Sequence, residues 1–144
     1  MFSFNEEMSR EIIMDHVSNP RNINKKRDNY PSYKIKNPSC GDEIELFVLL
    51  ENEIVKDITY LVMGCSMCKA SVSILSDSLI GKSKLEVKEF VSEFNKMVME
   101  EEYNSDILKE AVCLKGVVNV PPRIKCVTLG YKALTQLIGD DSSE

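Results

Sequence analysis

The sequence predicts an α+β fold in which a small antiparallel sheet of about three strands is covered by helices. Two apolar runs separated by a three-residue polar turn lie in the first half of the chain, where they indicate a β-hairpin. After Gly64 the apolar residues recur with helical spacing instead. The chain lacks the alternation of strands and helices that a parallel sheet needs, so the helices are expected to cover an antiparallel one.

The first expected helix covers residues 4–18. Ser3 and Glu6 have the spacing of a capping box at its start, and the apolar residues that follow recur at helical spacing. Pro20 is expected to end the helix, because the residue before a proline disfavours helical backbone angles. The next stretch is rich in proline and asparagine and is expected to be a loop with a short strand around residues 33–35.

Two longer strands are expected over residues 43–50 and 54–63. Residues 51–53 between them are polar and suit a hairpin turn. Apolar residues alternate in the second strand, which is typical of a strand with one buried face. Four residues are expected on that face: Ile54, Ile58, Tyr60 and Val62.

The segment after Gly64 is expected to be helical. An apolar stripe begins at Ala70 and ends before Gly81, a residue type that commonly follows the last turn of a helix. Ser83 and Glu86 form a second capping box, which predicts the start of another helix. The apolar face of that helix is expected to contain Leu85, Phe90, Phe94, Met97 and Val98.

Two further helices complete the expected fold. A short one lies near residues 105–113, and the last covers residues 123–138 after the pair Pro121-Pro122, which can open a helix. The whole chain, residues 1–144, is expected to form one domain, since its length is typical of single domains. Residues 139–144 are expected to be a frayed polar tail.

The composition is that of an ordinary globular domain and argues against several function classes. Asp and Glu outnumber Lys and Arg by 23 to 18, and the net charge of −5 argues against a general nucleic-acid binder. No apolar stretch approaches the roughly 20 residues that span a bilayer. The chain starts with an acidic segment and shows no signal peptide, so a cytoplasmic location is expected.

The chain has five cysteines, which are expected to stay reduced in the cytoplasm. Metal binding, catalysis and core packing are the roles left to them. His16 is the single histidine, which argues against a serine-hydrolase triad and against a histidine-rich metal site. We expect His16 on the helix surface or at a helix cap, and any metal to be held by thiolates and carboxylates.

Three of the thiols occupy positions that suit a metal ligand. Cys65 comes at the start of a predicted helix and Cys126 near the first turn of another, where the helix dipole stabilises a thiolate. Cys40 and Asp42 are two apart in an extended segment and therefore face the same way. These four residues would form a tetrahedral zinc shell of three sulfurs and one oxygen, with a charge of about −2. Three basic residues are expected to balance that charge: Lys69, Arg123 and Lys125.

The spacing leaves other roles open for the cysteines. Core packing suits Cys40, Cys65 and Cys126 as well, because free cysteine is among the most buried residue types, and Cys113 is expected in the core. The segment Cys65-Ser66-Met67-Cys68 has the pattern of a thioredoxin-like dithiol site, although the βαβ context of that fold is missing. Helical spacing also makes Cys68 a candidate for an alternative metal ligand or a second sulfur carrier.

Four short segments occur in a distinctive order along the chain. They are Met14-Asp15-His16 with Asn19-Pro20-Arg21-Asn22, Asn37-Pro38-Ser39-Cys40-Gly41-Asp42, Gly64-Cys65-Ser66 with Lys69-Ala70-Ser71, and Arg123-Ile124-Lys125-Cys126 with Lys132-Ala133-Leu134. In this order they resemble the iron–sulfur cluster assembly family that contains NifU N-terminal domains, IscU and SufU. Two features make the chain similar to the SufU branch. Lys125 stands where IscU scaffolds usually have a histidine, and an extra helical segment precedes it.

The resemblance implies an antiparallel sheet packed with helices, and zinc bound by Cys40, Asp42, Cys65 and Cys126. It implies a SufS-type, pyridoxal-phosphate-dependent cysteine desulfurase as the partner, whose persulfide sulfur would pass to Cys40. The zinc would hold Cys40 as a thiolate until a ligand from the partner displaces it. Arg123 would orient the partner or the incoming sulfur. Iron–sulfur scaffold proteins or thiols would then accept the sulfur.

On this interpretation the protein is a zinc-dependent sulfur acceptor, that is, a sulfurtransferase. One alternative is an IscU-type scaffold that assembles a transient [2Fe–2S] cluster on the same residues. Others are a dithiol oxidoreductase that uses Cys65 and Cys68, and a structural zinc domain without catalytic function. Cys68 stands where relatives usually have a hydroxyl residue, which leaves open whether it joins the ligand set.

Overall fold

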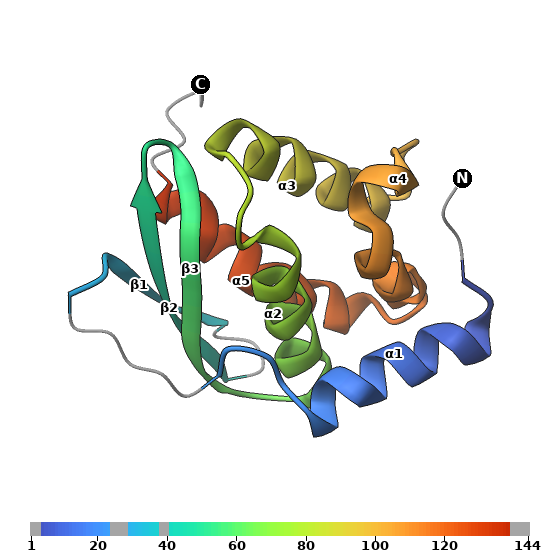
Figure 1. Cartoon of the computed structure of the whole chain (residues 1–144). Coiled ribbons are helices and arrows are strands. Elements are labelled where there is room, and N and C mark those ends of the chain that lie inside the picture. The colour runs from blue at the N-terminus through green and yellow to red at the C-terminus, as the bar shows by residue number, and fades with distance from the viewer. Residues whose placement is uncertain (1–3, 24–28, 38–40, 139–144) are drawn as a thin grey trace.

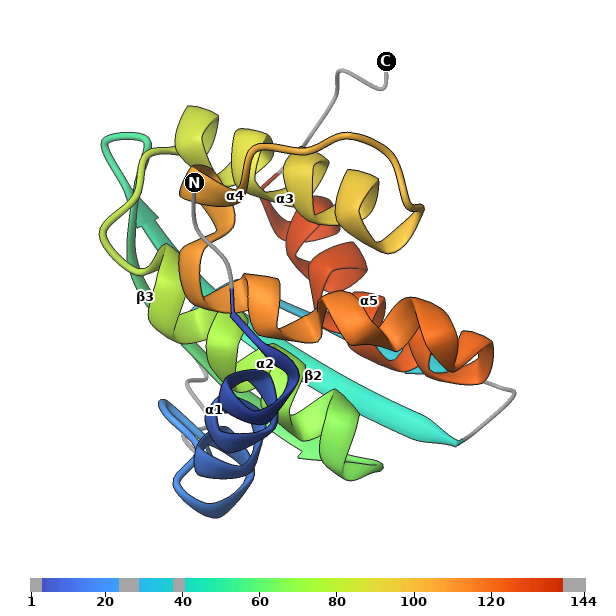
Figure 2. The same cartoon turned by 90° about the vertical axis from the view of Figure 1, so that its right-hand side faces the viewer.

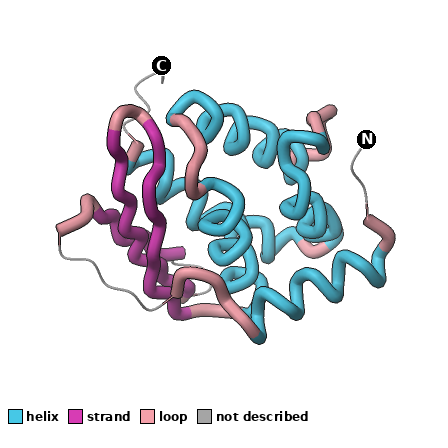
Figure 3. Tube along the Cα trace, in the orientation of Figure 1, coloured by secondary structure: helices cyan, strands magenta, loops and turns pink. Residues whose placement is uncertain are grey.

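The computed structural model describes residues 4–23, 29–37 and 41–138 of the chain. A three-stranded antiparallel sheet forms one side of the molecule and the helices pack on the other (Figure 1, Figure 3). The strands are β1 (Ser32–Asn37), β2 (Asp42–Glu51) and β3 (Ile54–Met63), and they are neighbours in that order. The helices are α1 (Glu6–Ser18), α2 (Ser66–Leu79), α3 (Lys84–Val98), α4 (Ser105–Leu108), η1 (Lys109–Asn119) and α5 (Pro121–Leu137). The α+β prediction is confirmed.

The sheet is a meander whose second turn is a tight hairpin. Asn52 and Glu53 connect β2 to β3 with φ angles of 54° and 66°, which are typical of two-residue hairpin turns. At the other end of the hairpin, Glu43 pairs with Met63, and β1 ends where Asn37 pairs with Asp42. The start of β2 and the end of β3 therefore lie side by side, next to the first turn of α2.

A β-bulge changes which residues of β3 are buried. Leu49 pairs with Asp57, but Leu50 pairs with Val55, so Lys56 is an extra residue in the ladder. Val55 is consequently fully buried together with Ile58 and Tyr60. The expectation of Ile54 on that buried face is wrong, because the bulge shifts the alternation by one residue.

Helices α2 and α5 pack against the sheet, and α3 packs behind them. The stripe predicted for α2 is confirmed, and the buried residues of α3 include Phe90, Phe94 and Met97 as expected. The ring of Tyr131 in α5 stacks on that of Phe94 with a centroid distance of 4.0 Å. Leu85 is 77% exposed, so its assignment to the apolar face of α3 is wrong.

The first residues of α1 and α3 test the predicted helix N-caps. The predicted capping box of Ser83 and Glu86 is confirmed at the start of α3. At α1 the side chain of Asn5 accepts a hydrogen bond of 2.7 Å from the backbone N–H of Met8, so Asn5 is the N-cap there. Ser3, which we expected in that role, lies outside the described residues.

The helical segment before the last helix is longer than predicted. The short helix expected near residues 105–113 is the four-residue α4 followed by the 3₁₀-helix η1, which continues to Asn119. Pro121 then opens α5 at its first turn, two residues before the predicted start. In the described parts of the chain, no helix combines the length and the apolar character needed to span a membrane.

Candidate metal centre

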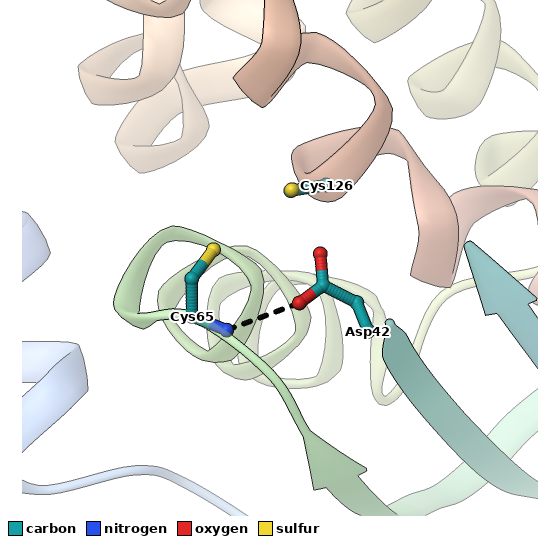
Figure 4. A group of neighbouring side chains, drawn as sticks. All are labelled: Asp42, Cys65 and Cys126. Atoms are coloured by element: carbon teal, nitrogen blue, oxygen red, sulfur yellow. Dashed lines mark hydrogen bonds between the residues drawn. The ribbon is translucent and has the colours of Figure 1, made fainter. Parts of the chain in front are cut away.

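Three side chains of the metal-ligating type converge at one edge of the sheet. Asp42 begins β2, Cys65 is the N-cap residue of α2, and Cys126 lies near the first turn of α5. A carboxylate oxygen and the two sulfurs all lie within 4.8 Å of one another, and Figure 4 shows the three groups pointing toward a common space. Asp42 and Cys126 are buried and Cys65 is half-buried, so one side of this space is accessible.

The backbone around Cys65 holds the Asp42 carboxylate in place. Its Oδ1 atom accepts a hydrogen bond of 3.1 Å from the backbone N–H of Cys65 (Figure 4). Gly64 leaves room for this contact, because a Cβ at that position would overlap the carboxylate. The sequence Gly64-Cys65 therefore both positions the carboxylate and begins the helix.

The second oxygen of Asp42 supports a cation at this centre. Within the described part of the chain, Oδ2 is buried and has no hydrogen-bond partner. A buried polar atom without a partner costs about 1–3 kcal/mol, and more for a charged group. A cation held between the carboxylate and the two sulfurs would remove this cost, and zinc accepts both thiolate and carboxylate ligands. The described residues thus fit a zinc ion.

Three basic residues lie close in the chain to the two cysteines, at the starts of α2 and α5. The side chain of Arg123 interacts with both thiols, and these interactions raise its pKa, with the charge of Cys65 as the largest cause. Lys125 directly precedes Cys126, and the backbone N–H of Lys69 donates to the carbonyl of Cys65 at 3.1 Å. All three basic side chains are exposed, as expected for groups that balance the charge of thiolates.

Comparison with known proteins identifies the family. A family model described as the NifU-like N terminal domain matches residues 8–140. The chain belongs to this family. The NifU-like domain is 38% identical over 136 residues to the zinc-dependent sulfurtransferase SufU of Bacillus subtilis. This alignment covers 92% of this chain and 92% of the relative. It is 36% identical over 128 residues to the iron–sulfur cluster assembly scaffold protein IscU of Streptococcus pyogenes, covering 88% of this chain and 80% of the relative.

Solved structures agree with this assignment. One is a crystal structure described as a candidate iron–sulfur cluster assembly scaffold protein for the SUF system, from Fervidobacterium islandicum. It superimposes on the NifU-like domain with a TM-score of 0.85 at 27% sequence identity. The match covers 94% of this chain and 99% of that chain. The resemblance drawn from the sequence segments is confirmed.

The structure brings together three of the four predicted ligands. Asp42, Cys65 and Cys126 come from segments far apart in the NifU-like sequence and meet in one cluster. Cys40 lies outside the described residues, so its place relative to the cluster stays a prediction. Cys126 is also part of the core, so packing and ligation are compatible for that residue.

The other two described cysteines do not take part in the cluster. Cys68 is fully buried in the core, and the described ligand group does not include it. No disulfide joins Cys65 to Cys68. Cys113 is buried as expected, and burial raises the pKa of its thiol to about 12. The alternative role of core packing therefore describes Cys68 and Cys113.

The expectation that His16 lies on the surface or at a cap is wrong. His16 is fully buried, with Nδ1 2.7 Å from Oγ of Ser73 in α2 and Nε2 3.0 Å from Oε1 of Glu110 in η1. The Ser73 oxygen also accepts the backbone N–H of Arg21 at 2.9 Å. The histidine thus joins three helical elements. Sequence reasoning missed this role because the partners lie 57 and 94 residues away in the chain.

Proposed function

We propose that this protein is a zinc-dependent sulfur acceptor that takes persulfide sulfur from a cysteine desulfurase for iron–sulfur cluster assembly. The observation that carries the proposal is the convergence of Asp42, Cys65 and Cys126, with the buried and unpartnered Oδ2 of Asp42 among them. The SufU and IscU relatives support a role in iron–sulfur assembly. The desulfurase would be a pyridoxal-phosphate enzyme of the SufS type, and the protein would act as its sulfurtransferase.

The proposed zinc ligands are Cys40, Asp42, Cys65 and Cys126. Cys40 stands two residues before Asp42 in the chain, and it would add the third sulfur. Zinc, when bound, would keep the cysteines that it contacts as thiolates at neutral pH. The protein's own contribution is to hold the Asp42 carboxylate through the backbone of Cys65 and to balance the charge with Arg123.

The proposed transfer is a thiol–persulfide exchange at Cys40. Its thiolate attacks the outer sulfur of the persulfide on the desulfurase cysteine. The sulfur–sulfur bond of that persulfide breaks, and its electron pair leaves with the desulfurase cysteine as a thiolate. The outer sulfur and its proton stay on Cys40 as a new persulfide, so no oxidant or reductant is required. A downstream scaffold or thiol would take the sulfur by the same exchange.

The decisive experiment measures how much the protein stimulates cysteine turnover by a SufS-type desulfurase. Cys40→Ala is expected to abolish stimulation, because the acceptor sulfur is lost. Asp42→Asn should reduce the affinity for zinc more than about tenfold, since even changes in the groups around metal ligands cost 10–100-fold. Glu43→Gln, which alters the neighbouring carboxylate that pairs with Lys34 on the surface, is the matched control and should hold zinc normally. Full stimulation by Cys40→Ala would refute the proposal.

An IscU-type scaffold is the second candidate function. The IscU relative of Streptococcus pyogenes, at 36% identity, favours it, and thiolates with a carboxylate could also hold a [2Fe–2S] cluster. Anaerobic reconstitution with iron and sulfide separates the two functions. A stable brown protein that passes its cluster to an acceptor protein would support the scaffold, whereas a colourless protein that retains zinc would support the sulfur acceptor.

A further inference from the structure

The candidate metal centre, formed by Asp42, Cys65 and Cys126, adjoins a large cavity with an apolar lining. The cavity has a volume of about 900 Å³ and lies between α1, the first turn of α2, η1 and the start of α5. Figure 2 shows these elements around one face of the molecule. Ser66, which follows Cys65, and Arg123, which interacts with both thiols, belong to its lining. Most of the lining is apolar, and includes Ile13, Met14, Met67, Val117, Val118 and Val120.

Apolar side chains are exposed both in the cavity and close to Cys65 in the chain. Met14 is 53% exposed and Val120 is 48% exposed, and both line the cavity. Met63, at the end of β3 and separated from Cys65 only by Gly64, is 70% exposed. Exposed apolar surface that continues into a hollow commonly marks an interaction site. Since the cavity adjoins the thiols, a partner bound in it would have its contacting atoms close to the candidate metal centre.

The charge at this end of the cavity has the opposite sign to that of the chain. The net charge is −5, yet Arg123 interacts with both thiols, and the exposed Lys69 and Lys125 lie one helical turn after Cys65 and directly before Cys126. Among the described residues, no carboxylate forms an ion pair with any of these three basic groups. The charged residues elsewhere in the lining are of both signs: Glu6, Arg10, Glu101, Glu102 and Lys115. Three positive charges against a proposed zinc shell of about −2 leave a small positive excess at the candidate metal centre, which complements an acidic surface.

We propose that the cavity and the basic residues beside it form one docking surface for the cysteine desulfurase. An apolar segment of the desulfurase near its persulfide cysteine enters the cavity past Met14 and Val120. Acidic residues that flank this segment face Lys69 and Lys125. This places the persulfide at the end of the cavity where the described thiols, Cys65 and Cys126, lie. The inference rests on the proposed function and identifies the partner's contact surface as apolar with an acidic border.

Two pairs of variants of the full-length chain test the docking surface. Met14→Glu introduces a charge on an exposed residue of the cavity, and Leu85→Glu makes the same change at an exposed residue of α3 outside the lining. Lys69→Glu reverses a charge next to the centre, and Lys56→Glu reverses one at the β-bulge. The concentration of protein that gives half-maximal stimulation of a SufS-type desulfurase is measured for each variant, together with its zinc content.

The Met14→Glu and Lys69→Glu variants are expected to need at least about tenfold more protein for half-maximal stimulation, with normal zinc content and a normal maximal rate. The two control variants should match the wild type. Added salt should weaken stimulation by the wild type more than by Lys69→Glu, because the lost contact is ionic. Equal half-maximal concentrations for all four variants would refute the docking surface while leaving the sulfur-acceptor function standing. A wild-type protein that does not stimulate the desulfurase at all would refute both.

Discussion

The backbone N–H of Cys65 donates a hydrogen bond of 3.1 Å to Oδ1 of Asp42, and this contact ties the start of β2 to the start of α2. The second oxygen of the same carboxylate receives no hydrogen bond from the described residues, and Figure 4 shows it pointing toward the side on which the two sulfurs lie. One residue is thus positioned by the backbone through one oxygen and available to a cation through the other.

Gly64 is expected to be essential for metal retention. A methyl group at this position would overlap the carboxylate of Asp42, so Gly64→Ala should displace the ligand and lower the zinc content of the purified protein. Gly116→Ala is the matched control, because a Cβ there meets no heavy atom within 4 Å. Elemental mass spectrometry of both proteins checks the prediction. It is wrong if Gly64→Ala holds as much zinc as Gly116→Ala.

His16 is expected to contribute to stability and not to the metal centre. His16→Leu removes the partner of Ser73 and Glu110 and should lower the free energy of unfolding by about 1–3 kcal/mol. Glu110→Gln retains an oxygen that can accept from Nε2, and since Glu110 is 40% exposed its loss should be smaller. Urea denaturation measures both variants, and zinc content should stay normal. A His16→Leu protein as stable as the wild type would contradict this role.

Cys113 should resist alkylation even when the metal is removed. Burial raises the pKa of its thiol to about 12, so at pH 8 only about one molecule in ten thousand carries the reactive thiolate. Because the thiolate fraction rises with pH below this pKa, the labelling rate of the folded protein should increase about tenfold per pH unit. Mass spectrometry after iodoacetamide treatment compares Cys113 with the half-buried Cys65. Equal labelling of the two at pH 8 would show that Cys113 is accessible.

The raised pKa of Cys113 also makes stability depend on pH. The neutral thiol is favoured in the folded state, so its contribution is complete below the ordinary pKa of about 9 and is lost as the pH rises toward about 12. The difference in unfolding free energy between the wild type and Cys113→Ala should therefore shift by roughly 1.4 kcal/mol per pH unit against the wild type in this range. Urea titrations of the metal-free proteins at pH 8 and pH 10 measure that shift. An unchanged difference would argue against the burial effect.

Cys68 is expected to be dispensable for sulfur transfer. It is fully buried in the core and outside the ligand group of the described residues, so Cys68→Ala should retain zinc and stimulate the desulfurase normally. The substitution should only lower the free energy of unfolding, by about 1 kcal/mol, because buried packing is lost. A variant that folds and binds zinc but no longer stimulates the desulfurase would revive a dithiol mechanism with Cys65.

Much of the fold could be predicted because its signals are local. The hairpin at residues 51–53, the capping box of Ser83 and Glu86, and the helix start at Pro121 each depend on neighbouring residues only. The errors arose where local patterns were insufficient. The bulge at Lys56 shifts the pattern of β3 through its pairing with β2, and Leu85 is exposed although its helix is amphipathic.

The candidate metal centre also depends partly on local sequence signals and partly on long-range contacts. By itself the sequence determined the chemistry, since only thiolates and carboxylates were present in number and the order of four segments indicated the family. Only the tertiary structure decided that Asp42, Cys65 and Cys126 meet while Cys68, three residues from Cys65, does not. It also decided that the lone histidine is buried against Ser73 and Glu110. The physical reason is that contacts between distant segments depend on strand register and helix packing, which the residue types near each site do not specify.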